Sequence, residues 1–394
     1  MEKRAVESKR VRVASNEVVR DINKRVVLNL IRTRQPVSRA DLARLCGLQR
    51  STVSLIVEEL IEERWVLEGA TGRLPRGRRP TFLRLNDERV IIGVDIRPTQ
   101  ITVVLADANA RFLTQEVLPT PADSGVAIDG LIARIQRLIR SCEGRKIEGI
   151  GISLPGRVAI GSERLVFAPN LKWPELDIRT PVEKATGLEV ELENAANACV
   201  LAAVWFDQMD SRNLVVVTVS EGIGTGVYVN GRLARGFSGM AGEFGHLPLD
   251  PEGPLCGCGS RGCWEVFGSN RAALRYYFES SAQPAGLSFP DLLTLADQGD
   301  GLAAKALEKM ARYLGRGMRM IVAGLDPEQI VVIGDLTRSW HRFGPIIEAE
   351  VRAQVLPGAA APRLIPGHEG GMARLRGTVA LVLQKHFGVS PAIS

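Results

Sequence analysis

One histidine and three cysteines near the middle of the chain constrain its fold more than any other feature. His246 is followed by Cys256, Cys258 and Cys263 in a glycine-rich stretch, although the 394 residues include only four histidines and six cysteines. Three thiolates and one imidazole are the ligand set of a closed, tetrahedral zinc site, which leaves no position for water. The alternative is three buried cysteines beside an unrelated histidine. Disulfides are disfavoured because the other cysteines are scattered. The pattern predicts a structural zinc ion that holds one loop.

Length and charge indicate several domains with different partners. A chain of 394 residues exceeds one ordinary core, so two or three domains are expected. No apolar run is long enough to span a bilayer, and the N-terminus lacks the apolar core of a signal peptide, so we expect a cytoplasmic protein without membrane contact. Residues 1–85 carry a net charge of +9, whereas the remainder carries −3. The basic segment is expected to meet a polyanion, and a solvated basic tail is the alternative.

Residues 16–86 contain three predicted helices in the order of a helix-turn-helix. Apolar residues at helical spacing predict a first amphipathic helix, which Pro36 ends. The apolar face of this helix is expected to contain Ile22, Val26, Val27, Leu30 and Ile31. Residues 38–41 predict a capping box that opens a short second helix. Gly47 makes the turn into a third helix over residues 49–63.

The start of the third helix and the basic loop that follows are the predicted DNA contacts. Short polar side chains at a helix N-terminus can reach base edges in a major groove. Strand-like runs at 65–67 and 81–85 flank a loop that predicts a wing, whose arginines would enter a minor groove or contact phosphates. A three-helix interaction module with a basic linker is the alternative. The predicted DNA-binding residues are Gln49, Arg50, Ser51, Thr52 and Ser54 in the helix and Arg73, Arg76, Arg78 and Arg79 in the wing.

The rest of the chain alternates apolar strand patterns with helical ones. Strands are predicted at residues 90–95, 101–105, 149–153, 214–219 and 330–333, and helices at 128–142 and 303–322. Strands that end in glycine loops and alternate with helices indicate an α/β protein whose ligand lies at the strand ends. The Gly-x-Gly-x-Gly run at 222–226 is weak evidence of a nucleotide site, because tight turns explain it equally well.

Three motifs of this region resemble the ROK family (repressors, open reading frames and kinases): residues 192–198, 242–246 and 256–265. The resemblance implies an α/β fold with a two-lobed, actin-like sugar-kinase domain of the ribonuclease H-like type. Repressors of this family add an N-terminal winged helix-turn-helix. The implied domains are a basic tail (1–15), the winged helix-turn-helix (16–86), lobe 1 (87–200) and lobe 2 with the zinc loop (201–394), with the C-terminal helix as a candidate to return to lobe 1.

The resemblance also implies a sugar pocket in the cleft between the two lobes. Carboxylates and amides suit this task because each sugar hydroxyl both donates and accepts a hydrogen bond. His246 would place one ring nitrogen on zinc and the other toward the sugar, so the metal would support the pocket. The sugar-contacting residues that the family implies are Asn194, Glu243, His246, Glu265, Gly156 and Asn170.

Two departures from the kinases of this family predict that the chain is not an enzyme. Those kinases have an aspartate directly after the pocket asparagine, where it accepts the proton of the attacking hydroxyl, and this chain has Ala195. Their phosphate loop continues Ile-Gly-Gly-Thr after the strand aspartate. Here Arg97 adds bulk and Pro98 lacks an N–H donor. We therefore expect no catalytic residue and no ATP.

The combined prediction is a ROK-type transcriptional regulator, most simply a repressor. A sugar or sugar derivative in the degenerate kinase cleft would control its affinity for double-stranded operator DNA. One recognition helix makes few base contacts, so a homodimer or tetramer on an inverted repeat is expected. Control by a protein partner and an active ATP-dependent sugar kinase are the alternatives. The retained pocket residues argue against a purely architectural DNA-binding protein.

Overall fold

The computed structural model of the protein describes residues 16–71, 80–142, 144–159, 164–168, 170–207, 209, 211–281, 286–353, 360–367 and 370–388. The predicted basic tail and the wing residues Arg73, Arg76, Arg78 and Arg79 lie outside these ranges. The chain divides into two units: one runs up to Asn86 and also contains His386–Gly388, and the other is Asp87–Lys385. Within the described ranges, no helix combines the length and apolarity needed to cross a membrane.

Local capping signals define the helices of the first unit. These helices are α1 (Asn16–Arg34), α2 (Arg39–Cys46) and α3 (Arg50–Glu62). The Oγ atom of Ser38 accepts from the backbone N–H of Asp41, and the carboxylate of Asp41 accepts from the backbone N–H of Ser38. This capping box is the predicted one. Gly47 ends α2 with a left-handed φ of 68°, so the predicted turn is also confirmed.

A three-stranded antiparallel sheet completes the first unit. Its order is β1 (Val37–Ser38), β3 (Thr81–Leu85) and β2 (Val66–Thr71). The side chain of Asn29 donates to the carbonyl of Phe387 over 2.8 Å, and the ring of Trp65 packs edge-on against Phe387. The end of the C-terminal helix is therefore part of this unit's core.

One expectation for α1 is wrong. Ile22 belongs to the predicted apolar face but is 54% exposed, whereas Val27 and Ile31 are fully buried. Near Ile22 the contacts between α1 and α3 are ion pairs, from Arg20 and Lys24 to Glu59 and Glu63. The apolar core thus begins one turn later than the periodicity suggests.

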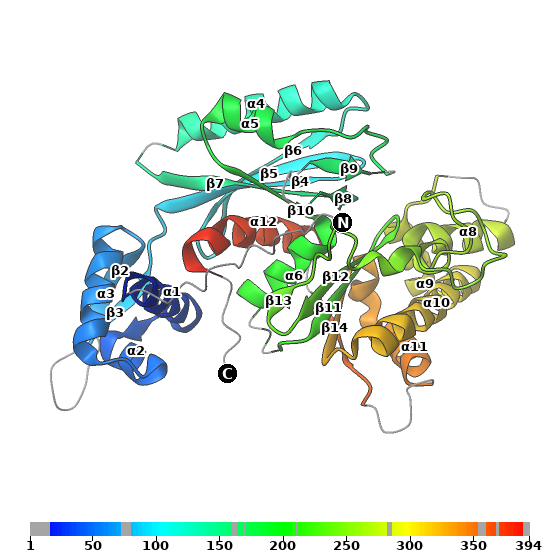
Figure 1. The fold of residues 1–394 in the computed structure, drawn as a ribbon. Coiled ribbons are helices and arrows are strands. Elements are labelled where there is room, and N and C mark those ends of the chain that lie inside the picture. The colour runs from blue at the N-terminus through cyan, green and yellow to red at the C-terminus, as the bar shows by residue number, and fades with distance from the viewer. Residues whose placement is uncertain are drawn as a thin grey trace, which may run out of the picture. The chain divides into compact units, whose positions relative to one another are not determined.

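The second unit contains two five-stranded sheets with the same topology (Figure 1). The first has the order β10 (Val190–Asn194), β7 (Lys146–Leu154), β4 (Arg89–Ile96), β5 (Gln100–Asp107) and β6 (Phe112–Pro119). The second has the order β13 (Arg232–Leu233), β12 (Ile223–Val229), β11 (Leu214–Val219), β14 (Gln329–Ile333) and β15 (Arg363–Pro366). In each sheet the first strand along the chain is central, and it pairs antiparallel with the second and parallel with the fourth. The unit is therefore a duplicated α/β fold, as predicted.

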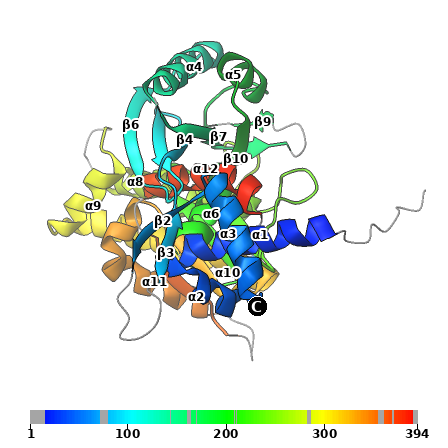
Figure 2. The same ribbon diagram turned by 90° about the vertical axis from the view of Figure 1, so that its left-hand side faces the viewer.

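Helices cover both faces of each sheet. On the first sheet, α4 (Ser124–Ser141) and α5 (Arg179–Thr186) lie on one face and α12 (Gly370–Phe387) on the other (Figure 1, Figure 2). The helices around the second sheet are α6 (Ala195–Phe206), α8 (Asn270–Ser280), α9 (Phe289–Asp297), α10 (Gly301–Leu325) and α11 (Trp340–Arg352). Val215 and Val217 of β11 pack with α8–α11, whereas Val216 packs with α6. Burial on both faces explains why β11 is apolar except at Thr218.

Two sequence-based assignments change in this unit. The predicted boundary between residues 200 and 201 falls inside α6, which packs against β11 and β12, so the second lobe begins nearer Asn194. Residues 222–226 are not a series of turns, because β12 begins at Ile223. A Cβ atom on Gly226 would lie 2.6 Å from the carbonyl oxygen of Ala196, so this glycine permits close packing of α6.

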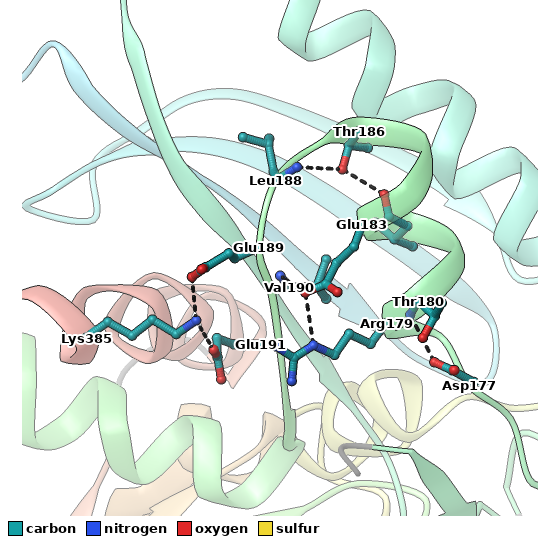
Figure 3. A network of polar contacts seen from close by, with 11 residues as sticks. Asp177, Arg179, Thr180, Glu183, Thr186, Leu188, Glu189, Val190, Glu191 and Lys385 are labelled. Atoms are coloured by element: carbon teal, nitrogen blue, oxygen red, sulfur yellow. Dashed lines mark hydrogen bonds and ion pairs between the residues drawn. The ribbon is translucent and has the colours of Figure 1, made fainter. Parts of the chain in front are cut away.

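Helix α12 packs closely on the first sheet and is fastened to its edge. The fully buried Thr378 lies against Gly93 and Gly151, where a Cβ atom at position 151 would come within 2.2 Å of its carbonyl oxygen. At the sheet edge, the ammonium group of Lys385 forms ion pairs with two carboxylates, one on β10 and one on the residue just before β10 (Figure 3). The partners of Lys385 are Glu189 and Glu191.

This packing makes Gly151 sensitive to a single added methyl group. Gly151→Ala should lower the free energy of unfolding by about 1–3 kcal/mol, because α12 must move to admit it. Urea unfolding followed by circular dichroism measures this change. Gly130→Ala on α4 is the matched control: nothing lies within 4 Å of its Cβ position, so this substitution should be neutral or stabilising. Equal stabilities of the two variants would contradict the packing.

Candidate ligand cavity and metal centre

A cavity of about 540 Å³ opens in the second unit where strands of both sheets end. Gly156 lies just after β7, Asn194 ends β10, and Ser220 follows β11. The carboxyl ends of parallel strands are the usual ligand-binding positions of α/β proteins. The cavity lining includes all six residues implied as sugar contacts: Gly156, Asn170, Asn194, Glu243, His246 and Glu265.

The side chain of Asn194 joins two backbone segments that line the cavity, the start of α6 and the residues after β7. Its Oδ1 atom accepts from the backbone N–H of Ala196 at 2.8 Å and of Asn197 at 3.4 Å, which caps α6. Its Nδ2 atom donates to the carbonyl oxygen of Gly156 over 2.6 Å. Most of the side-chain amide is therefore used within the protein, and a single N–H remains for a ligand.

Two glutamates and His246 form a polar wall. Glu243 and His246 lie in the short 3₁₀ helix η1 (Glu243–His246), and Glu265 begins α7 (Glu265–Gly268). The Nε2 atom of His246 is 3.8 Å from Glu243 Oε2, and its Nδ1 atom is 3.7 Å from Glu265 Oε1. Burial raises the pKa of the Glu243 carboxyl, which His246 lowers and Glu265 raises further. The wall thus offers several oxygen acceptors for hydroxyl groups.

The histidine and the three cysteines of the central motif meet in one cluster. Their ligand atoms all lie within 4.8 Å of one another, with 3.7 Å between the sulfurs of Cys258 and Cys263 and 3.6 Å from Cys256 Sγ to His246 Nδ1. Tetrahedral ligands at zinc bond lengths are separated by about 3.5–3.8 Å. Burial raises the pKa of Cys258, but hydrogen bonds with Ser260, Cys256 and Cys263 together outweigh it and lower the pKa to about 7. The cluster could therefore bind a metal ion such as zinc.

His246 links the cluster to the cavity. Its Nδ1 atom faces Cys256, whereas its Nε2 atom faces Glu243 on the cavity wall. A metal on Nδ1 would fix both the tautomer and the orientation of the ring.

Ala195 lines the cavity at the first position of α6. The adjacent carboxylate of Glu193 is held within the protein. It is buried and accepts from Arg235 Nε at 2.7 Å and from Asn197 Nδ2 at 3.0 Å. Its oxygens are therefore engaged, and Glu193 is not among the residues that line the cavity.

The cavity also contains residues that the sequence analysis missed. These are chiefly Arg157, Ser220, Glu221, Arg271 and Arg374. Ser220 and Glu221 follow β11 directly, so their position at a strand end was a usable signal. Arg374 comes from α12, the C-terminal helix that was a candidate to return to lobe 1, but no motif marks Arg374 itself as a cavity residue.

The first residues of α3 present the predicted polar surface in the first unit. Gln49, Arg50 and Ser51 are exposed, and Thr52 and Ser54 are partly buried. Leu55 was missed, although it is 62% exposed on the same face of α3, one turn after Ser51. The sequence could have indicated this exposure, since Leu55 is apolar but lies outside the helical repeat of the buried residues of α3.

Fold and cavity together define an α/β protein of the two-lobed sugar-kinase class with an added N-terminal unit. The chain belongs to the ROK family, whose model matches residues 91–385. It is 31% identical over 383 residues to the xylose repressor of Bacillus spizizenii, covering 95% of this chain and 98% of that one. It is 26% identical over 356 residues to the Escherichia coli transcriptional dual regulator NagC, covering 87% and 88%.

Solved structures show the same relationship. A ROK family transcriptional regulator described as a homologue of the E. coli MLC protein has a TM-score of 0.81 and 25% identity, with 94% of this chain and 98% of that chain covered. A ROK glucokinase from Streptomyces griseus in complex with glucose and AMPPNP has a TM-score of 0.65 and 29% identity. It covers 74% of this chain and 98% of its own.

The capping role of Asn194 leads to a stability prediction. Asn194→Ala should lower the free energy of unfolding by about 1–2 kcal/mol, because two N–H groups of α6 and the carbonyl of Gly156 lose their partner. Asn170→Ala is the matched control: among the described residues, the hydrogen bond given for Asn170 is a long one of 3.4 Å from Arg271, so its loss should cost less than about 0.5 kcal/mol. Thermal and urea unfolding measure both. Equal losses would show that Asn194 has no special structural role.

Proposed function

We propose that the protein is a DNA-binding transcriptional regulator, most simply a repressor, whose operator affinity changes when a sugar or sugar derivative binds in the cavity. The main support for this proposal is a combination of two features. The same chain contains a basic three-helix unit and a sugar-kinase cavity in which Ala195 stands at the position of the kinase base. The named xylose repressor matches along nearly its whole length, which supports the same combination. A cytoplasmic location is consistent with this role.

The first unit is proposed to be a winged helix-turn-helix. In this assignment α3 enters the major groove, where Arg50 and Ser51 reach base edges or phosphates. The exposed Leu55 would contact a thymine methyl group. The wing arginines remain a prediction from the sequence. Two copies of such a head suit an inverted repeat, so we propose a homodimer or a higher oligomer on DNA.

The cavity is proposed to bind the ring hydroxyls of a sugar. Glu243 and Glu265 offer carboxylate oxygens to hydroxyl donors, and the remaining N–H of Asn194 offers a donor to a hydroxyl oxygen. Gly156 has a φ of +96°, and its backbone forms part of the cavity wall. A ligand that prefers one arrangement of the regulator would shift its DNA affinity, whereas equal preference would shift nothing.

We propose that the cavity binds without catalysing phosphate transfer. Methyl cannot accept the proton of an attacking hydroxyl, and loss of a general base removes about 10²–10⁴ in rate. After β4, Arg97 and Pro98 occupy the place of the kinase glycines, so no ATP is expected there.

The metal in the proposed assignment is a structural zinc ion. His246, Cys256, Cys258 and Cys263 would hold it, which leaves no ligand position for water and therefore no Lewis-acid role toward substrate. Its function would be to hold the cysteine loop and the ring of His246 beside the cavity.

DNA binding is tested by fluorescence anisotropy with an operator selected from genomic fragments. Arg50→Ala should weaken specific binding by about 10- to 100-fold, because one base or phosphate contact is lost. Arg137→Ala is the control, since Arg137 is exposed on α4 and makes no predicted DNA contact.

A panel of sugars should contain one that stabilises the protein thermally and changes operator affinity. Absence of any affinity for duplex DNA would refute the proposed function.

The zinc assignment is tested by metal analysis of the purified protein. One zinc ion per chain is expected, and Cys263→Ala should lose it and lower the melting temperature. Cys46→Ala should retain the metal, because Cys46 ends α2 in the other unit. His246→Ala should also abolish the effect of the sugar on operator affinity. The physical reason is that the metal loop is proposed to transmit the effect of the bound sugar to the DNA-binding unit. An unchanged sugar response in the His246→Ala variant would exclude this role.

A further inference from the structure

Helix α1 has a second apolar face, which is exposed. Val27 and Ile31 are fully buried in the core of the first unit, whereas Val19 and Ile22 are 46% and 54% exposed. Val26 lies one turn after Ile22 and is partly exposed. At 3.6 residues per turn, positions 19, 22 and 26 fall within about 60° of one another around the helix. They therefore form one continuous stripe, separate from the side of α1 that packs in the core.

The exposed stripe lies away from the proposed DNA contacts. The first turns of α1 contact the C-terminal end of α3 through ion pairs from Arg20 and Lys24 to Glu59. The proposed DNA contacts are at the other end of α3, at residues 49–55. Within the first unit, the start of α1 extends past α2 and α3 (Figure 2). A partner on this stripe would therefore leave the DNA-contacting end of α3 open.

Two opposite charges flank the stripe on one side. Asp21 and Arg25 are 69% and 50% exposed, and their side chains approach each other to 4.0 Å. If two α1 helices pack antiparallel about a two-fold axis near Asn23, Asp21 of each copy lies opposite Arg25 of the other copy. A parallel pair would instead place this flank opposite Asn23. The charges thus match an antiparallel pair of identical helices.

The stripe is too small to hold two copies together by itself. A stable interface covers about 800 Å² on each partner, and three aliphatic side chains supply only part of that area. DNA can supply the missing proximity, because two heads on one inverted repeat are held at a high effective concentration. Small size and self-complementary charge together favour a second DNA-bound copy of this chain as the occupant.

We propose that α1 of one DNA-bound copy packs antiparallel against α1 of a second copy. Val19, Ile22 and Val26 form the apolar contact, and Asp21 and Arg25 form an ion pair on each side of the two-fold axis. This inference rests on the proposed DNA-binding function and specifies how two heads cooperate on one operator. Pairing adds affinity for the complete inverted repeat and none for a single half-site.

The flanking charges provide a test that separates contacts between copies from contacts within one chain. Asp21→Arg brings like positive charges together across the pair, and Arg25→Asp brings like negative charges together. Each variant alone should lower the ratio of operator affinity to half-site affinity by about 3- to 10-fold. A mixed pair with one copy of each variant restores opposite charges between the copies, although the ion pair within each chain stays broken. A mixture of the two variants should therefore recover most of the lost ratio.

Fluorescence anisotropy of the full-length protein on the operator and on one half-site measures this ratio. The two variants are co-expressed and titrated together, so that mixed pairs can form on the operator. The half-site corrects for the direct effect of an added charge on DNA affinity. Glu62→Arg is the matched control, because it makes the same charge change as Asp21→Arg at an exposed position of α3. Its ratio should equal that of the unaltered protein.

The apolar contact is tested separately with Ile22→Asn. The ratio should fall by about 10-fold, because each copy loses the burial of one isoleucine side chain. Half-site affinity and the free energy of unfolding should stay the same, since Ile22 is exposed in the single chain. Leu45→Asn is the matched control, because Leu45 is 52% exposed at the end of α2 and lies outside the stripe. This control should leave the ratio unchanged.

The outcomes separate this inference from the regulator itself. If all variants keep the ratio of the unaltered protein, or if the mixed charge variants show no recovery, α1 does not pair and the regulator stands. If the mixture shows no recovery and removal of residues 2–15 lowers the free energy of unfolding, the N-terminal segment of the same chain covers the stripe and the inference is overturned. If the unaltered protein binds neither operator nor half-site, the proposed function fails as well.

Discussion

The pairing of parallel strands in two sheets of identical topology determines where everything else lies. In each sheet, the central strand and its parallel neighbours end at the same edge. The backbone leaves those strands at Gly156, Asn194 and Ser220, which line the first cavity. Close packing keeps this arrangement intact, because Gly151 and Gly226 admit a helix where any side chain would collide. The ligand cavity is thus a consequence of strand pairing, and its chemistry is decided by the residues at the strand ends.

The parts of the fold governed by local rules could be predicted from the sequence. The Ser38–Asp41 capping box depends on four consecutive residues, and Gly47 needs only its own left-handed conformation, so both were recognised. The metal-ligand set was equally accessible, because Cys256, Cys258 and Cys263 are close in sequence and few other cysteines compete. Nearly continuous apolar runs also located the central strands β4 and β11, since both faces of these strands are buried.

What could not be predicted depends on contacts between distant segments. The C-terminal helix was a candidate to return to lobe 1, but Arg374 is more than 150 residues from Ser220, and no local pattern indicates that the two line one cavity. Tight turns were one explanation of the Gly-x-Gly-x-Gly run, whereas in the structure Gly226 lies in β12 and permits the close approach of α6. Asn194 was interpreted through its ligand alone, although most of its amide joins α6 to Gly156. In each case the residue type could be interpreted from the sequence, but the distant segment that it contacts could not.

Two features of the cavity support the proposal that it binds a sugar without transferring phosphate. A site that transfers phosphate needs a base beside the acceptor hydroxyl and an unobstructed backbone around the phosphates. Ala195 lines the cavity at the position proposed for that base, and just after β4 the Arg97 guanidinium donates to Asp95 at 2.6 Å. A site with neither a proton acceptor nor an open phosphate loop can bind a sugar and leave it unchanged. In the proposed function it is this binding without turnover that changes operator affinity.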